Sequence, residues 1–390
     1  MLHPVKVNAT IAGLGITAVG KIYDPSATDF AAEAVRRAVA DAGLPLSCID
    51  GLLVSSGLKR DLTISLANVL GLSDLRLLTE MQAFGASAGA MISYAASAVS
   101  SGAAETVACV YADAPLKPKK TAGASYTGRS PKPITGINSY LFGSGITNPN
   151  VFYALAARRH METYGTTSAQ LGHIAVAQRA WAAMNPLAQL QDPITLEDHQ
   201  NSRIIAEPLR LLDCCLVSNG GVAIIVTTPE RARDLAQPPV DILGWGQGHP
   251  VDVRERGSGF GLRTGAAIAG PIAMQMAGVT IHDIDMAQLY DSYTFTTLIS
   301  LEDYGFCAKG EGGAFVSDGR LGPNGTFPLN TGGGELSSFY LWGMTPLHEA
   351  VVQGRGMAGE RQVAKRDVIL VSGSGGILDH HATLILGGAQ

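Results

Sequence analysis

The residues best suited to chemistry are tyrosines in two short segments of the second half of the chain. One segment is Tyr290-Asp291-Ser292-Tyr293, and the other ends in Tyr340 after a run of glycines. A phenol titrates at about pH 10, so it can accept a proton where nearby dipoles lower its pKa, or donate a hydrogen bond to an oxyanion. Tyr290, Tyr293 and Tyr340 are therefore candidate acid–base groups. Aromatic packing at a strand end or on a helix is the alternative interpretation.

Other groups beside these tyrosines could orient them or bind a substrate oxygen. Asp291 either orients a tyrosine hydroxyl or caps the turn that follows it. The glycines of two late loops could present backbone N–H groups to a substrate oxygen, although ordinary turns would also account for them. These candidate binding glycines are Gly332, Gly333, Gly334, Gly373, Gly375 and Gly376.

Three histidines are further acid–base candidates. His348 falls on a helix predicted at 339–353, where we expect it to be partly exposed. His380 and His381 precede a final strand predicted at 382–386. Because side chains alternate between the two faces of a strand, one of this pair is expected to face the site. A structural histidine with satisfied hydrogen bonds is the alternative for each of the three.

The cysteines predict neither a metal site nor a disulfide framework. They are odd in number and never spaced Cys-x-x-Cys, so a reducing cytoplasm is the expected location. Cys109 lies in an apolar strand and is expected to be part of the core, while the others flank strands or lie in loops. The five are Cys48, Cys109, Cys214, Cys215 and Cys307.

The composition excludes several classes of protein. The chain has 390 residues, 46% of them hydrophobic and 16% charged, which is enough for two or three domains with a large core. Its net charge of −5 argues against binding to the phosphate backbone of nucleic acids. No uninterrupted apolar run reaches the length of a membrane span, and the first residues do not resemble a signal peptide.

Two stretches of the chain repeat the same order of elements. In each, an alanine-rich helix ends at Ala-Gly, a short polar link leads to Ile-Asp, and an apolar strand follows. The repeated residues are Ala42, Gly43, Ile49 and Asp50 in the first copy and Ala277, Gly278, Ile284 and Asp285 in the second. We therefore predict an α/β protein made of two similar, parallel βαβαβ halves.

A region of different character interrupts the first half. It opens with a polar loop at 115–136 that is rich in lysine, proline and glycine, and helices are predicted at 151–164 and 168–183. A buried strand returns at 222–226. The predicted organisation is an N-terminal half at 1–117 and 211–240, an inserted domain at 118–210, and a C-terminal half at 241–390.

These features together resemble the thiolase superfamily over nearly the whole chain. The most specific motifs are Asp-Cys-Cys-Leu-Val-Ser-Asn-Gly-Gly at 213–221, Leu-Asn-Thr-Gly-Gly-Gly-Glu-Leu-Ser at 329–337 and Ser-Gly-Ser-Gly-Gly at 372–376. The stretch 301–316 resembles the sterol-carrier-protein or lipid-transfer-protein-like branch. The resemblance implies the thiolase fold, a five-layer α/β/α/β/α sandwich of two duplicated βαβαβ halves with an inserted loop domain. It also implies that the glycine loops bind a thioester oxygen.

The catalytic cysteines of thiolases are missing from this chain. In our alignment Gly85 takes the place of the nucleophilic cysteine at a helix N-terminus, and Ser372 or Gly373 takes that of the second cysteine. A thiolate held at a helix N-terminus is the usual nucleophile for acyl transfer. The Gly-His-Pro segment of thiolases is also absent, because 338–343 occupies its position. Acyl transfer through cysteine is therefore not expected.

The pattern is similar to that of the cysteine-free, lipid-transfer-protein-like aldolases. Those enzymes carry one tyrosine in a Tyr-Asp-x-(Phe/Tyr) segment and another just after Asn-Thr-x-Gly-Gly-x-Leu-Ser, as Tyr290 and Tyr340 stand here. The chain departs from the aldolase pattern after Tyr340. Trp342, Thr345 and Pro346 replace residues of a histidine- and asparagine-containing segment, so the lining of the substrate pocket is expected to differ.

The resemblance implies a carbon–carbon lyase that cleaves a β-hydroxyacyl-CoA by retro-aldol chemistry. Coenzyme A would enter as part of the substrate, with no covalently bound cofactor and no metal. It also implies a homodimer that joins a small zinc-ribbon and OB-fold protein in a heterotetramer. Two alternatives stay open: a retro-Claisen thiolase or acyltransferase with an unusual site, and a non-catalytic subunit that binds acyl-CoA or lipid. The acyl group, whether steroid, aromatic or terpenoid, is left open by the sequence.

Overall fold

The structure, a computed structural model, describes residues 7–57, 62–124, 135, 139, 143–146, 148–250 and 259–389. Half of the polar loop predicted at 115–136, namely 125–134 and 136, lies outside these residues. The strands are β1 (Thr10–Ile16), β2 (Gly51–Ser55), β3 (Leu77–Glu80), β4 (Thr106–Asp113), β5 (Ile204–Ala206), β6 (Leu209–Arg210), β7 (Gly220–Thr227), β8 (Val240–Gly248), β9 (Met286–Gln288), β10 (Ile369–Gly375) and β11 (His380–Gly387).

The helices of the described residues include the two predicted at 151–164 and 168–183 and several that the sequence patterns did not predict. They are α1 (Ala27–Ala42), α2 (Leu62–Leu70), α3 (Ser87–Ser100), α5 (Pro149–Tyr164), α6 (Ser168–Ala182), α7 (Leu196–Asn201), α8 (Pro229–Ala232), α10 (Ala266–Ala277), α11 (Thr294–Tyr304), α12 (Gly312–Val316), α13 (Gly334–Ser337) and α14 (Met344–Gly354). Glycine ends α1 and α10 in the left-handed conformation, at Gly43 and Gly278, as the Ala-Gly repeat predicts.

The strands form one nine-stranded sheet in the order β3-β2-β4-β7-β1-β8-β11-β10-β9. The first five belong to the N-terminal half and the last four to the C-terminal half. Within the sheet of the described residues, β1 and β8 join the two halves by pairing Thr10 with Asp241 and Ile11 with Val240. The prediction of parallel halves is wrong in detail, because β7 and β11 run antiparallel to their neighbours and make each half mixed.

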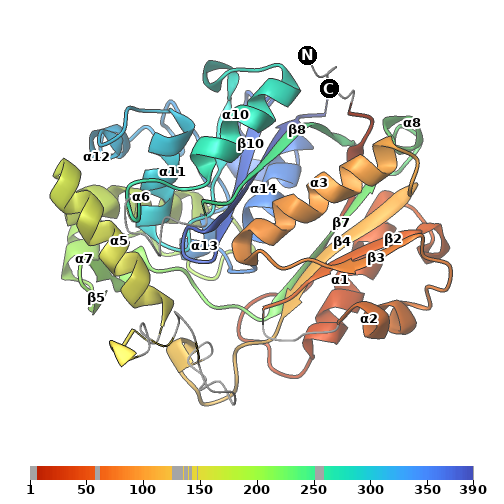
Figure 1. Ribbon diagram of the computed structural model, residues 1–390, viewed down its shortest axis with the longest axis horizontal. Helices are drawn as coiled ribbons and strands as arrows, with labels where there is room; N and C mark the ends of the chain where they lie inside the picture. The colour runs from red at the N-terminus through yellow and green to blue at the C-terminus, as the bar shows by residue number, and fades with distance from the viewer. Residues whose placement is uncertain are drawn as a thin grey trace.

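Helices cover both faces of each half and produce the five layers that the resemblance implies (Figure 1). Helices α1 and α2 pack on the outer face of the N-terminal half, and α10 and α11 lie on the outer side of the C-terminal half. Helices α3 and α14 lie between the halves, where apolar side chains from both halves form one shared core. The N-terminus of α3 thus points into the middle layer of the molecule.

The repeated Ile-Asp pairs have the same structural task in both halves. The Asp50 carboxylate accepts hydrogen bonds from the backbone N–H groups of Glu105 and Thr106, where β4 begins. Asp285 accepts from the N–H of Val368, one residue before β10. In each half the aspartate therefore ties the start of one strand to the start of its parallel neighbour, which explains why the motif recurs at the same place.

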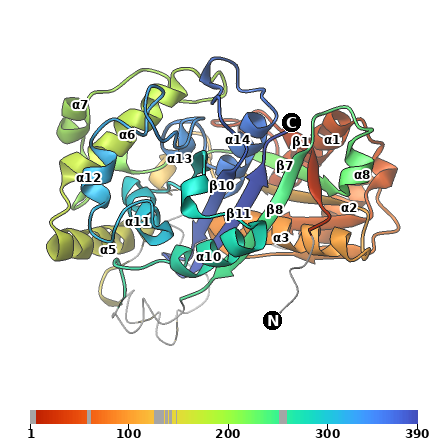
Figure 2. The same ribbon diagram turned by 90° about the horizontal axis from the view of Figure 1, so that it is seen from above.

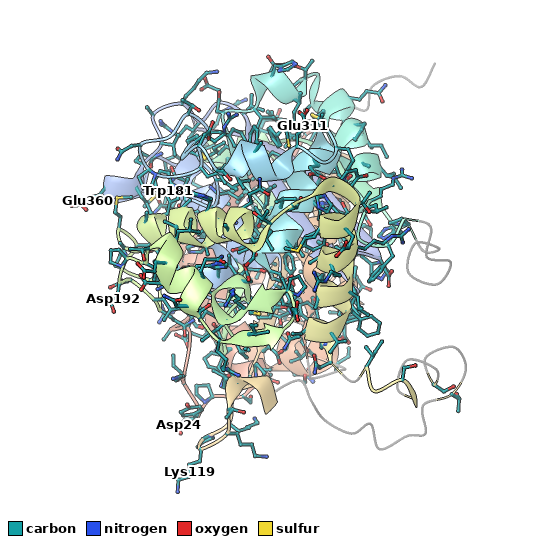
Figure 3. All side chains as sticks on the ribbon, turned by 90° about the vertical axis from the view of Figure 1, so that its left-hand side faces the viewer. Asp24, Lys119, Trp181, Asp192, Glu311 and Glu360 are labelled. Carbon is teal, nitrogen blue, oxygen red and sulfur yellow. The ribbon has the colours of Figure 1, made fainter. Side chains whose placement is uncertain are left out.

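The insertion lies against the C-terminal half, at the opposite end of the molecule from α1 and α2 (Figure 2). Helix α6 packs against α11, α12 and α13. Trp181 on α6 donates a hydrogen bond of 2.8 Å to the carbonyl oxygen of Leu321, and both residues are buried (Figure 3). The insertion is thereby fixed to the half that carries the candidate tyrosines.

None of the helices in the described part of the chain combines the length and the apolar composition that a membrane-spanning helix needs.

A buried ion pair joins the outer helix of one half to the middle layer. Arg355, just after α14, lies 2.8 Å from the carboxylate of Asp41 on α1, and it also donates to the carbonyl oxygen of Ala12 in β1. The same Asp41 oxygen accepts from the N–H of Leu14. The Arg355 side chain is only 2% exposed, so its charge depends on this one carboxylate.

We predict that Asp41→Ala lowers the free energy of unfolding by roughly 3 kcal/mol, because it leaves a buried guanidinium without its counter-charge. Denaturation by urea would measure the change. Glu33→Ala on the same helix is the matched control, since the Glu33–Arg37 pair is about half exposed and should contribute little. Equal effects of the two substitutions would contradict the structural importance of the buried pair.

Candidate active site

The structure brings Tyr290 and Tyr340 together. Tyr290 lies two residues beyond the end of β9, and its hydroxyl is 3.0 Å from that of Tyr340, close enough for a hydrogen bond in either direction. Tyr290 is buried and Tyr340 is half-buried. Open α/β sheets place ligands beyond the carboxyl ends of their strands, and this pair lies at such a position.

The segment that carries Tyr340 differs from the prediction. A helix was expected over 339–353, but α14 begins only at Met344. The residues before it form a tight turn, in which Trp342 adopts a φ of 51° and Leu341 bridges to Gly343. The turn directs Tyr340 toward Tyr290, and a helical start would have carried the tyrosine around the helix instead.

Burial raises the pKa of the Tyr290 hydroxyl, so the tyrosine loses its proton less readily. Its pKa is raised well above 10 by loss of solvent, and further by the neighbouring Tyr340 and Glu335. Of the two uses considered for this tyrosine, a base with a lowered pKa and a donor to an oxyanion, the raised pKa favours the donor. Tyr290 is a neutral phenol at physiological pH and can act as a proton donor.

Gly85 lies directly against the Tyr290 ring. A Cβ atom at position 85 would overlap the edge of that ring and the carbonyl oxygen of Ser374. The tyrosine thus fills the space that a cysteine at position 85 would need. Gly373 and Gly375 of β10 pack against the backbone of residues 83–86, where a side chain on either glycine would not fit. Gly343 likewise meets the carbonyl oxygen of Gly85, so four glycines permit this contact.

The glycines predicted to bind a substrate oxygen mainly shape the backbone. Gly333 and Gly334 adopt φ angles of 96° and 62°, and the Gly333 N–H donates to the carbonyl oxygen of Asn330. A side chain on Gly332 would meet the Glu349 carboxylate. Gly373 and Gly375 are strand residues paired with β11, and Gly376 turns the chain after β10 with a φ of 64°. Their expected role toward a thioester stays a prediction.

Asp291 caps a helix and does not orient a tyrosine hydroxyl. Its fully buried carboxylate accepts hydrogen bonds from the N–H groups of Glu335 (2.8 Å) and Leu336 (3.1 Å), in the first turn of α13. Burial raises its pKa to about 7, and these two hydrogen bonds oppose that rise. Of the two roles considered, capping is the one observed, although the capped turn is α13 and not the turn that follows in sequence.

Tyr293 faces the insertion, away from the hydrogen-bonded pair. Its hydroxyl donates to the side-chain oxygen of Asn150 at 2.5 Å, and its ring packs on Tyr153 with centroids 4.5 Å apart. Both partners belong to helix α5. Tyr293 thus links the C-terminal half to the insertion, and this contact gives it a positioning role.

His348 and His381 are both buried, with surroundings that the sequence did not predict. His348 is 4% exposed, so the expectation of partial exposure is wrong, and burial beside Arg361 and Arg355 lowers its pKa to about 3. Buried His381 bonds through Nε2 to the Tyr304 hydroxyl and the Ser372 hydroxyl, on the face of the sheet toward α11.

His380 lies on the opposite face of β11 from His381. It pairs with His249 at 3.0 Å and stacks on Phe84, with ring centroids 6.2 Å apart. Phe84 is 45% exposed and also contacts Trp342. His380 therefore lies on an aromatic rim beside Gly85, and its ring pairs with His249 rather than with either tyrosine.

Strained backbone, which sequence reasoning did not anticipate, marks the same region. Phe84, Asn330 and Trp342 all adopt φ near 50° although none is glycine. Such conformations cost free energy and gather at functional sites, where the surrounding structure enforces them. The three residues border Gly85, the glycine run and Tyr340 respectively. Only the glycines around them gave a signal in the sequence.

The cysteines are poorly suited to nucleophilic catalysis. Burial raises the pKa of Cys214 and Cys307 to about 12, and that of Cys109 and Cys215 even further above the usual value. A thiol with a raised pKa holds little thiolate at neutral pH. In the described residues no group of three histidine, cysteine or acidic side chains is arranged to hold a metal ion.

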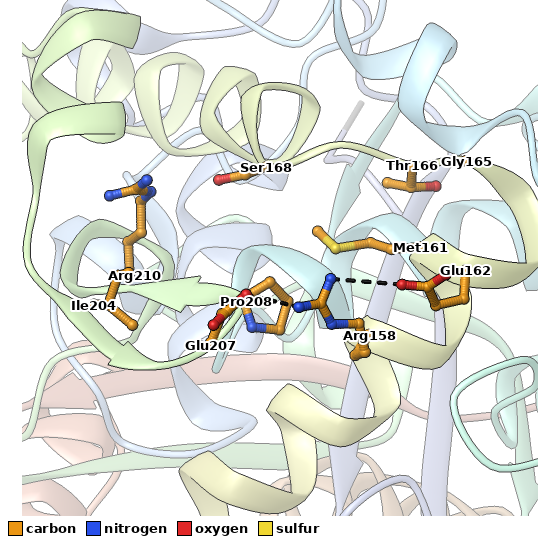
Figure 4. A pocket seen from close by; sticks show the side chains of 10 residues that line it. All are labelled: Arg158, Met161, Glu162, Gly165, Thr166, Ser168, Ile204, Glu207, Pro208 and Arg210. Carbon is orange, nitrogen blue, oxygen red and sulfur yellow. Dashed lines mark hydrogen bonds and ion pairs between the residues drawn. The ribbon is translucent and has the colours of Figure 1, made fainter.

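A surface cavity of about 450 Å³ lies in the insertion, between α5, the start of α6 and the β5–β6 hairpin (Figure 4). Arg158 projects into it but is already paired with Glu207 at 2.6 Å and Glu162 at 3.6 Å. Its charges are therefore balanced within the protein. Neither Tyr290 nor Tyr340 lines this cavity, so it is separate from the tyrosine pair.

Comparisons with known proteins agree with this geometry. The family model of thiolase C-terminal domain-like proteins matches residues 254–388. A steroid side-chain-cleaving aldolase of Thermomonospora curvata is 39% identical over 94% of this chain and 95% of its own. A 17-hydroxy-3-oxo-4-pregnene-20-carboxyl-CoA lyase of Mycobacterium tuberculosis is 38% identical over 94% and 96%. A solved structure described as Ltp2-ChsH2(DUF35) aldolase superposes with a TM-score of 0.89 and 37% identity over all of both chains.

We predict that Gly85→Cys destabilises the protein and does not create a working nucleophile, because the new side chain must displace the Tyr290 ring. The free energy of unfolding should fall by roughly 1–3 kcal/mol, as in other overpacked sites. Gly123→Cys is the matched control, since a Cβ atom there meets nothing within 4 Å. A Gly85→Cys variant as stable as the wild type would show that the tyrosine does not exclude the cysteine.

Proposed function

This chain belongs to the thiolase superfamily, in its sterol-carrier-protein-type branch, and we propose that it cleaves a carbon–carbon bond of a β-hydroxyacyl-CoA by retro-aldol chemistry. The observation that carries the proposal is the 3.0 Å contact between the Tyr290 and Tyr340 hydroxyls, beside a glycine at the position of the thiolase nucleophile. Two relatives of similar length that bear aldolase and lyase names support it.

The tyrosine pair can perform both proton transfers of a retro-aldol reaction. Tyr340, the more exposed of the two, takes the proton of the β-hydroxyl, and the electrons of that O–H bond form the new carbonyl. The carbon–carbon bond then breaks, and its electrons pass to the α-carbon as a thioester enolate. Tyr290, a neutral phenol, delivers its proton to that enolate. As Tyr340 accepts the substrate proton, it passes its own proton across the 3.0 Å hydrogen bond to Tyr290, so the two transfers occur together and both tyrosines end as neutral phenols.

This relay does not require either tyrosine to be ionised before the reaction begins. A phenol that is neutral at rest suits it, because the proton moves from substrate to substrate through two hydroxyls. The raised pKa keeps Tyr290 protonated at neutral pH, so the tyrosine holds a proton to give to the strongly basic enolate, whereas little phenolate base would be present. The coenzyme A portion leaves as part of the shorter product, so no further cofactor is required by this scheme.

A retro-Claisen reaction is the second candidate, since acetyltransferases are also among the relatives. That reaction needs a nucleophile to carry the acyl group, and Gly85 has none to offer. The structure favours the aldolase scheme for this reason. A requirement for free coenzyme A and a β-ketoacyl-CoA would favour the Claisen scheme, and acyl-CoA binding without turnover would favour a non-catalytic subunit.

We propose a polycyclic acyl group, such as a steroid side-chain acid, because two relatives carry steroid names. The aromatic rim of Phe84 and Trp342 beside Gly85, with Tyr111 packed behind it, offers flat apolar surface for such a group. The acyl-CoA named for the lyase of Mycobacterium tuberculosis is the obvious first probe. Its cleavage to a ketone and a shorter acyl-CoA, measured without added coenzyme A, tests the proposal.

Assembly as a homodimer is proposed from the edge of the sheet. Strand β3 ends the strand order, so its outer edge is open for pairing with a second copy in the described structure. Ile64 and Val69 on the adjacent α2 are 62% and 48% exposed.

A small zinc-ribbon and OB-fold partner is proposed as well, since the related solved structure bears a two-component name. The five free cysteines fit the expected reducing cytoplasm.

We predict that Tyr290→Phe and Tyr340→Phe each lower the rate of cleavage about 100-fold or more, the usual scale for acid–base groups. Each change removes one oxygen and keeps the ring, so the fold and the affinity for acyl-CoA should be retained. Tyr94→Phe, on the exposed side of α3, is the control. Near-wild-type rates in both site variants would reduce the tyrosines to packing residues.

We predict that light scattering at micromolar concentration gives twice the mass of the chain, and that Ile64→Asp reduces this mass. Ile272→Asp on α10, which is 44% exposed, is the matched control and should leave the mass unchanged.

Co-expression with a zinc-ribbon and OB-fold protein should give a stable complex with higher activity. A wild-type chain that is monomeric and fully active alone would oppose both assembly proposals.

A further inference from the structure

A second acidic side chain lies beside the tyrosine pair and has no role in the scheme above. Glu335, in the first turn of α13, is fully buried. Within the described residues, neither of its carboxyl oxygens has a hydrogen-bond partner. Buried polar groups almost always have partners, so an orphaned carboxyl indicates that something else supplies one.

The backbone of Glu335 is fixed on both sides. Its N–H donates to Asp291, and its carbonyl oxygen accepts from the N–H of Leu216 at 3.0 Å. The side chain therefore cannot relax toward solvent by moving the turn. It is held among residues from three different parts of the chain, which makes its position a property of the assembled site and not of a flexible loop.

The groups around this carboxyl are acidic or neutral. They are Asp291, which follows β9; Tyr290, from the same connection; Cys215, which precedes β7; and Tyr153, on α5 of the insertion. Desolvation, together with the neighbouring Asp291, raises the pKa of Glu335 well above its usual value. The group is therefore a neutral carboxylic acid, which carries one O–H donor.

We infer that Glu335 donates a hydrogen bond to the thioester oxygen of the bound substrate, while Tyr290 gives its proton to the α-carbon of the enolate. The inference rests on the proposed retro-aldol function. When the carbon–carbon bond breaks, negative charge develops on that oxygen, and a preorganised donor in a dry site stabilises it strongly. A phenol together with a carboxylic acid kept neutral by burial is a pair of donors suited to an enolate.

The first test compares two substitutions by their rates of cleavage of 17-hydroxy-3-oxo-4-pregnene-20-carboxyl-CoA. Glu335→Leu removes the donor and should lower the turnover rate about 100-fold, while the affinity for substrate changes little. Glu335→Gln keeps an N–H donor of similar size and should stay within about 10-fold of the wild type. Glu360→Gln, at an exposed position, is the control (Figure 3). Equal rates for the Leu variant and the wild type would overturn the inference.

The second test reads the carboxyl itself and needs no turnover. Infrared difference spectra of wild type against Glu335→Gln should show the C=O stretch of a protonated carboxylic acid. The band should shift when an uncleavable acyl-CoA without the β-hydroxyl binds. An ionised Glu335, or a band that ignores the ligand, would contradict the inference even if Glu335→Leu fails to fold. Absence of cleavage by the wild type, with the band shift intact, would contradict the proposed reaction and not the donor.

Discussion

The site depends on one steric constraint, the exclusion of any side chain at position 85. The Tyr290 ring occupies the space next to Gly85, and β10 and the turn before α14 press their own glycines against the backbone of the same short segment. Interiors are packed too closely for a ring and a cysteine to share one place. The choice between a thiol nucleophile and a phenol is therefore made by volume, before any question of reactivity arises.

Most of the buried titratable groups at the site are also uncharged at neutral pH. Tyr290 and Glu335 are neutral, Asp291 titrates at about 7, and His348 and His381 are uncharged at neutral pH. Burial is the leading cause in every case, since it disfavours the charged form of acids and bases alike. Such surroundings would oppose a resting thiolate. They suit a reaction in which protons move between neutral hydroxyls and negative charge exists only for the lifetime of the enolate.

The sequence predicted the parts of the fold that local rules determine. The helix ends at Gly43 and Gly278 were predicted from the repeat. The repeat also brought out Asp50 and Asp285, but their hydrogen bonds to the strand starts emerged only from the structure. The proximity of Tyr290 and Tyr340 was also within reach, because a strand end and a glycine turn converge. The directions in which His348 and His381 point were not, since they depend on which layer covers each face. Glu335 was missed because its interest lies in the absence of a partner, which only packing reveals.

Both hydroxyls proposed to be catalytic come from the C-terminal half, whereas the N-terminal half supplies a helix end and a glycine. The halves pair through β1 and β8 in the sheet and pack together in the middle layer. In the proposed reaction, the C-terminal copy of the duplicated fold therefore supplies the acid–base groups. The N-terminal copy shapes the space that the Tyr290 ring occupies. In a recombined protein, the reaction type should travel with the C-terminal half, and a foreign N-terminal half would be compatible only if it leaves the Tyr290 ring its space.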